Sequence, residues 1–136
     1  MIKSILSVED DTTTHLLNKL YLDEAKFCEN YIEALNGQLA INYFIELAKQ
    51  DDCLLKVPEL ILLDLNMPLM DGWEFLETFE KEFPQFAERT KIYILSSSIN
   101  PMDKERAVRE KGVCGFVEKP LDFDQIERLK KELGLA

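Results

Sequence analysis

What is scarce in this sequence excludes several classes of protein. No apolar run approaches the ~20 residues that a membrane-spanning helix needs, and the first residues lack the pattern of a signal peptide. The three cysteines are scattered without metal-ligand spacing, so we expect small apolar side chains in a cytoplasmic protein. Basic residues number 16 against 26 acidic ones, and the net charge of −10 argues against nucleic acid and anionic membranes as partners.

The length of the chain and its uniform composition along the sequence predict one domain. At 136 residues it can bury a core without disulfides or structural metals. No internal repeat, low-complexity tract or linker interrupts it. We therefore expect a single domain over residues 1–136, with no attached output domain.

Short apolar segments alternate with amphipathic segments from end to end. This alternation predicts right-handed crossovers, and so an α/β fold with a doubly wound parallel sheet and helices on both faces. Leucines at helical spacing mark the first helix, and its His15 is expected on the surface. The predicted strands span residues 2–8, 26–34, 59–65, 91–95 and 113–118, and the predicted helices span 12–22, 37 to about 48, 72–82, from 101 onward, and 123–133.

Polar side chains follow four of these strands directly. In a parallel doubly wound sheet, ligands bind beyond the carboxyl ends of the strands, where these residues would converge. Carboxylates brought close together repel one another and lose hydration, and a hard divalent cation such as Mg²⁺ relieves both costs. The residues expected at this edge are Asp10, Asp64, Ser96 and Lys119.

Four sequence strings resemble the signatures of the response regulator receiver domain of two-component signalling. The resemblance covers roughly residues 2 to 133, and the string around Asp64 is highly specific. It implies a flavodoxin-like (βα)5 fold with strand order 2-1-3-4-5 and a stand-alone domain of the CheY-like type. The strings are Val8-Glu9-Asp10-Asp11, Leu63-Asp64-Leu65-Asn66-Met67-Pro68-Leu69-Met70-Asp71-Gly72, Leu95-Ser96-Ser97 and Glu118-Lys119-Pro120.

The resemblance also implies roles for individual residues. Asp64 would take a phosphoryl group from a phosphohistidine, which a carboxylate can do by forming an acyl phosphate. Magnesium would be bound by Asp64 itself, by Asp10 directly, by Glu9 through a water and by the backbone carbonyl of Asn66. Lys119 would meet a phosphate oxygen and, before phosphorylation, Asp64; the family holds the bond to Pro120 in the cis form.

The family transmits phosphorylation through a hydroxyl and an aromatic ring. Ser96 matches the hydroxyl position and Phe116 matches the aromatic position on the fifth strand, so both are the expected switch residues. Met67 and Ser98 match positions that tune the access of water, and neither carries a carboxylate or amide that would position water. The expected output surface combines the fourth predicted helix, the fifth strand and the last helix.

The expected partners are a sensor histidine kinase or a histidine phosphotransfer protein, and an unknown downstream protein that contacts the output surface. The domain would be a monomer or weak dimer, with no activity beyond self-phosphorylation from a donor and self-dephosphorylation. A phosphorelay intermediate and a phosphate sink stay open as alternatives. A binding module that never accepts phosphate is disfavoured, because the acids, the lysine and the hydroxyl are all present. A phosphatase of the haloacid-dehalogenase type is disfavoured, since it needs an aspartate where this chain has Asn66.

Overall fold

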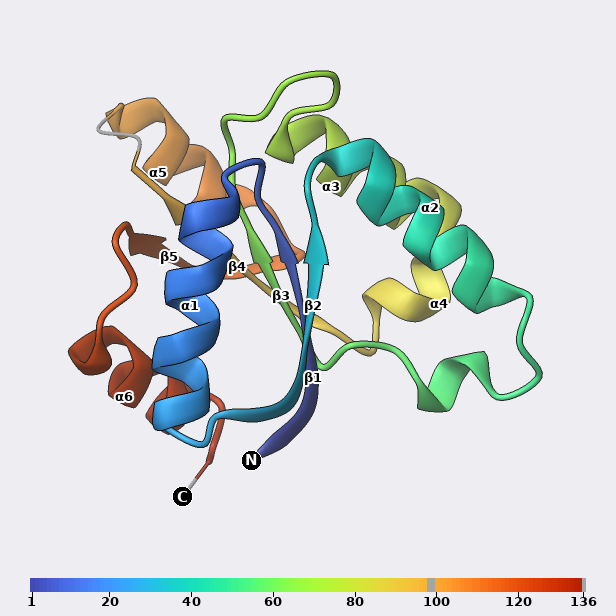
Figure 1. Ribbon diagram of the computed structural model, residues 1–136. Helices are drawn as coiled ribbons and strands as arrows, with labels where there is room; N and C mark the ends of the chain where they lie inside the picture. The colour runs from blue at the N-terminus through green and yellow to red at the C-terminus, as the bar shows by residue number, and fades with distance from the viewer. Residues whose placement is uncertain (98–99, 136) are drawn as a thin grey trace.

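A five-stranded parallel sheet forms the centre of the computed structural model, which describes residues 1–97 and 100–135 (Figure 1). The strand order is β2-β1-β3-β4-β5, so the predicted doubly wound, flavodoxin-like topology is confirmed. The strands are β1 (Ile2–Val8), β2 (Cys28–Ala34), β3 (Leu60–Leu63), β4 (Lys91–Ser96) and β5 (Val113–Glu118).

Five long helices connect or follow the strands, as predicted. Two short pieces were not predicted: the 3₁₀ turn η1 (Cys53–Leu55) and the helix α4 (Pro84–Ala87). The fourth and last predicted helices are therefore α5 and α6 of the structure. The long helices are α1 (Thr12–Glu24), α2 (Gly37–Ala48), α3 (Gly72–Glu82), α5 (Pro101–Arg109) and α6 (Phe123–Glu132).

Each long helix begins at an aspartate or asparagine whose side chain accepts a backbone N–H of the first turn. Such a cap satisfies one of the donors left free at a helix start and contributes about 1 kcal/mol. Because the caps are short polar residues that directly follow strands or loops, they fix where each helix starts in the sequence. The capping residues are Asp11, Asn36, Asp71, Asn100 and Asp122.

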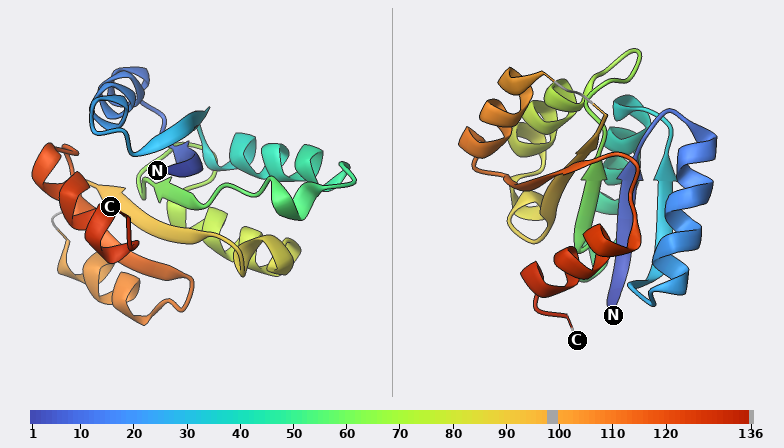
Figure 2. Two further views of the ribbon diagram at one scale, coloured as in Figure 1. Left: turned by 90° about the horizontal axis from the view of Figure 1, so that it is seen from below. Right: turned by 90° about the vertical axis from the view of Figure 1, so that its left-hand side faces the viewer.

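The sheet is covered on both faces, with α1 and α6 on one side and α2, α3 and α5 on the other (Figure 2). Successive residues of the central strands alternate between the two resulting cores: Ile61 faces the second group of helices and Leu62 the first. Strands buried on both faces explain the near-continuous apolar runs of the sequence. The second strand starts at Cys28 rather than at residue 26, because Lys26 adopts a left-handed conformation (φ 53°) that ends the preceding turn.

The first helix is turned differently from what its leucines suggest. Leu16, Leu17 and Leu20, whose spacing predicts the helix, are about half exposed, at 58%, 45% and 56%. The face turned toward the sheet carries His15, Asn18 and Leu22, which are buried. The prediction that His15 lies on the surface is therefore wrong: its ring is fully buried and hydrogen-bonded on both nitrogens.

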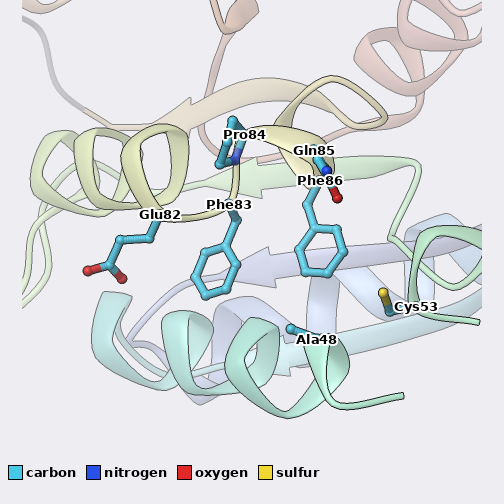
Figure 3. A pocket seen from close by; sticks show the side chains of 7 residues that line it. All are labelled: Ala48, Cys53, Glu82, Phe83, Pro84, Gln85 and Phe86. Atoms are coloured by element: carbon cyan, nitrogen blue, oxygen red, sulfur yellow. The ribbon is translucent and has the colours of Figure 1, made fainter. Parts of the chain in front are cut away.

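The edge of the sheet where the strands begin carries an apolar hollow of about 430 Å³, at the ends of α2 and α3 (Figure 3). The rings of Phe83 and Phe86 stack in parallel above it, with their centroids 5.7 Å apart, and Ala48 and Cys53 form the opposite wall.

Among the residues that the structure describes, no helix has both the length and the apolar character to cross a membrane.

Candidate functional site

The carboxyl ends of β1 and β3 bring three acids together, as the sequence predicts. Val8 pairs with Leu63 across the two strands, and the Asp64 N–H donates to the Val8 carbonyl at 3.0 Å. The next residues along each strand, Glu9 and Asp64, therefore leave the sheet side by side. One carboxylate oxygen from each of Glu9, Asp10 and Asp64 lies within 4.8 Å of the others. Asp10 is exposed, whereas the other two are buried.

Lys119 reaches the same cluster from the end of β5. Its backbone N–H donates to the Ser96 carbonyl at 3.0 Å, which fixes the end of β5 against the end of β4. The side-chain Nζ lies 3.5 Å from Asp64 Oδ2 and also donates to the carboxylate of Glu9. The bond between Lys119 and Pro120 is cis. The predicted pairing of Lys119 with Asp64 is present, and the contact with Glu9 is additional.

The electrostatics of the cluster favour a cation beyond the lysine. Burial raises the pKa of Glu9 above its ordinary value, and the neighbouring Asp64 raises it further, while Lys119 lowers it. Three carboxylates thus face one ammonium group in this cluster. Clustered carboxylate oxygens with one exposed member suit a hard, oxygen-binding divalent ion. The residues present can therefore hold a metal such as Mg²⁺, with Asp10 on the open side.

Of the remaining predicted residues, Ser96 and Asn66 lie at or after the carboxyl ends of β4 and β3, whereas Phe116 lies within β5. Ser96 ends β4 and is fully buried. Asn66 is exposed, and its backbone N–H lies 3.4 Å from Asp64 Oδ1. Phe116 is half-buried on β5, and the Nζ of Lys104 lies 5.7 Å from its ring centroid. Met67 packs against the core, whereas Ser98 lies outside the described residues.

A close backbone approach at Gly72 completes the site, and the residue-by-residue prediction missed it. The Gly72 N–H donates to the Leu65 carbonyl at 3.0 Å. A β-carbon at Gly72 would lie 2.5 Å from the Asp64 carbonyl oxygen, closer than side-chain atoms can approach. Only glycine lets α3 begin directly against the Asp64 backbone. The signal was present in the sequence, because Asp71-Gly72 closes the string that contains Asp64.

Comparison with known proteins agrees with the fold. The family model of the response regulator receiver domain matches residues 5–130. Chemotaxis protein CheY of Halobacterium salinarum is 30% identical, with 88% of this chain and 87% of that protein covered. Sporulation initiation phosphotransferase F of Bacillus subtilis is 29% identical, with 99% and 97% covered.

Solved structures and larger proteins show the same likeness. The crystal structure of a two component response regulator from Cytophaga hutchinsonii superposes with a TM-score of 0.86 at 29% identity, covering 97% of this chain and 96% of that one. The chain also matches three larger curated proteins, of whose lengths it spans only 8%, 14% and 57%. With its fold, its acidic edge and its matched residues, the chain belongs to the response regulator receiver domain family.

Proposed function

We propose that this protein is a Mg²⁺-dependent phosphoacceptor switch in which Asp64 takes a phosphoryl group from a phosphohistidine. The observation that carries the proposal is the convergence of Glu9, Asp10, Asp64 and Lys119 at one edge of the sheet. Isolated acidic clusters are common on protein surfaces, but here two of the acids are buried and a lysine is held against them. Buried acids with a lysine held against them are suited to a divalent cation and, with it, a phosphoryl group, rather than to solubility.

The chemistry follows from the positions of these side chains. A carboxylate oxygen of Asp64 attacks phosphorus, the bond from phosphorus to the histidine nitrogen breaks, and the nitrogen keeps the electron pair of that bond and takes a proton from solvent, so that neutral imidazole leaves. The main task of the site is to position the groups and to neutralise charge. Lys119, already 3.5 Å from Asp64, offers its ammonium to a phosphoryl oxygen. Asp10, Asp64 and the Asn66 carbonyl would hold Mg²⁺ directly and Glu9 through a water, and the ion would supply the remaining positive charge.

Two surfaces support a role in protein contacts. The exposed leucines of α1, Leu16, Leu17 and Leu20, lie on the helix that follows Asp10, so a kinase or phosphotransfer protein has an apolar surface beside the acidic edge. On the side of α5, β5 and α6, a hollow of about 400 Å³ is lined by residues that include Lys104 and Phe116. A ring at position 116 that turns inward with Ser96 would reshape this hollow and so change what it binds.

The test is chemical labelling. Incubation with acetyl phosphate and Mg²⁺ is expected to add one phosphate to the wild type, detected by intact-mass spectrometry. Asp64→Asn should accept none, and Asp51→Asn, at an exposed acid in the loop after α2, should label like the wild type. Labelling of Asp64→Asn at the wild-type rate would refute the assignment.

A relay function has specific support from the likeness to sporulation initiation phosphotransferase F over nearly the full length of both chains. In a relay, the acyl phosphate would pass to the histidine of a second protein instead of acting through a downstream contact. Mixing the labelled protein with a histidine phosphotransfer protein separates the two functions. Rapid transfer supports the relay, whereas phosphate that stays on Asp64 supports the switch.

The same labelled sample, incubated with p-nitrophenyl phosphate, should release no nitrophenol, as expected if Asn66 cannot act as a general acid.

A further inference from the structure

The buried face of α1 carries a histidine directly behind the acidic edge. His15 is fully buried, and its Nε2 lies 2.8 Å from the backbone carbonyl oxygen of Glu9. Its Nδ1 lies 3.0 Å from the hydroxyl of Tyr31 on β2, and the two rings meet edge to face at 79°. A fully buried histidine with both nitrogens hydrogen-bonded has one fixed orientation, so it can hold whatever it binds in place.

The partners determine which nitrogen carries the proton. A carbonyl oxygen only accepts hydrogen bonds, so Nε2 bears hydrogen and donates to Glu9. In the neutral ring Nδ1 then accepts from the Tyr31 hydroxyl. Burial raises the pKa of Tyr31 to about 12, so this hydroxyl keeps its proton at neutral pH. The chain of donors therefore runs from Tyr31 through His15 to Glu9 in one direction.

Both backbone polar groups of Glu9 are hydrogen-bonded. Its N–H donates to the Ala34 carbonyl at the end of β2 at 2.9 Å, and its carbonyl accepts from His15. At this residue the chain leaves the sheet, and the next residue, Asp10, is exposed. The hydrogen bonds to Ala34 and through His15 to Tyr31 both tie this exit to β2. Together they set the direction in which the carboxylates of Glu9 and Asp10 leave the backbone.

We propose that His15 and Tyr31 are positioning residues, which hold the backbone of Glu9 so that the acidic edge is preorganised for a divalent cation. The inference rests on the proposed function, because it assigns a role in the same site. Ligands whose orientation is fixed by hydrogen bonds behind them bind metal more tightly than free ones. Neither residue touches the metal or the phosphoryl group, so their effect appears first in metal affinity.

Three variants separate positioning from simple filling of space. His15→Leu keeps an apolar side chain in the core but removes both hydrogen bonds. His15→Gln keeps an N–H that can donate to the Glu9 carbonyl. Tyr31→Phe keeps the ring and removes only the hydroxyl that fixes His15. Tyr43→Phe on α2, whose ring packs on Phe44 at 5.3 Å, is the matched control for loss of a tyrosine hydroxyl.

The main readout is the dissociation constant for Mg²⁺ alone, measured by isothermal titration calorimetry on the unphosphorylated protein. We expect His15→Leu, which loses two hydrogen bonds, to weaken binding about tenfold, and Tyr31→Phe, which loses one, to weaken it about threefold. His15→Gln and Tyr43→Phe should stay within about twofold of the wild type. In the His15→Leu background, Tyr31→Phe should add nothing, because both residues act through one carbonyl. Nitrogen-15 NMR of the ring should show hydrogen on Nε2.

A purely structural role predicts a different pattern. Lower stability in urea, with Mg²⁺ affinity unchanged in both His15→Leu and Tyr31→Phe, would overturn the proposal. If His15→Leu does not fold, Tyr31→Phe decides alone, since it changes a single hydroxyl. Acetyl phosphate labelling of the wild type, run in parallel, keeps the two proposals apart. A wild type that binds Mg²⁺ but does not label refutes the phosphoacceptor function and leaves the affinity comparison intact.

Discussion

Replacing Lys119 by methionine removes the cation held between two buried carboxylates while keeping a long apolar stem. The Nζ of Lys119 contacts both Glu9 and Asp64, whose side chains are 3% and 6% exposed. In the metal-free protein the variant leaves these acids without the ammonium that offsets their charge. We expect Lys119→Met to lower the free energy of unfolding substantially at neutral pH.

The magnitude follows from the contact distances and the burial. At 3.5 Å, with an effective dielectric constant of about 20, the attraction between Lys119 and Asp64 is about 5 kcal/mol. The desolvation of the lysine side chain, which is only 19% exposed, offsets part of this attraction. Removing one partner of a buried pair costs about 3–5 kcal/mol, and the residual exposure places this case at the lower end, about 3 kcal/mol.

The loss should depend on pH with a defined sign. The pKa of Glu9 is already raised by burial and by Asp64, and loss of Lys119 removes the two contributions that lower it. A carboxyl group whose pKa is higher in the folded than in the unfolded state favours folding at low pH. That stability is fully present below the unfolded pKa, about 4.3, and is lost as the pH rises through the folded value. The destabilisation should therefore be largest near pH 7 and smallest near pH 4.

The assay is urea unfolding followed by circular dichroism, in EDTA, at both pH values. Lys49→Met is the matched control, because Lys49 pairs with Glu46 at 3.0 Å with side chains 66% and 71% exposed, and it should change stability by less than about 0.5 kcal/mol. Adding Mg²⁺ should stabilise Lys119→Met more than the wild type. A loss of less than about 1 kcal/mol at pH 7, or an equal loss at both pH values, would refute the reasoning.

Two further substitutions test the close approach at the site and the packing of the hydrophobic core. Gly72→Ala places a methyl group 2.5 Å from the Asp64 carbonyl oxygen. We therefore expect the start of α3 to move and labelling by acetyl phosphate to slow at least about tenfold. Labelling at the wild-type rate would contradict the close approach. Phe44→Ala empties a fully buried position beside Phe79, whose ring centroid is 4.6 Å away. It should lower the free energy of unfolding in urea by about 3–5 kcal/mol. The control Phe123→Ala, at a side chain that is 46% exposed, should lower it by less than about 1.5 kcal/mol.

The strands, the long helices and the acidic edge were predictable because each has a local signal. Apolar runs mark strands buried on both faces, and the Asx caps mark where helices begin. The acids follow strand ends, so the parallel topology alone brings Asp64 beside Glu9. The short helix at Pro84–Ala87 was not predicted, since a single turn has too few residues to show a period.

The orientation of α1 could not be predicted from its own residues. Its leucines give the apolar side of an amphipathic helix, and a lone histidine among them is typical of the exposed side. In the folded protein the polar groups of Glu9 and Tyr31 lie beneath the helix and pair with His15, so the histidine is buried whereas Leu16, Leu17 and Leu20 are exposed. The competing interaction comes from residues on β1 and β2, which the helical pattern does not contain.

The sequence by itself determined the order of the elements, the family and the identity of the acids and lysine at the strand ends, because these depend on local patterns and on topology. Only the tertiary structure decided that Lys119 is shared between Glu9 and Asp64, that Gly72 lies against the Asp64 backbone, and that His15 is buried behind them. These depend on distances between residues far apart in the chain, which are set by how the sheet and the helices pack together.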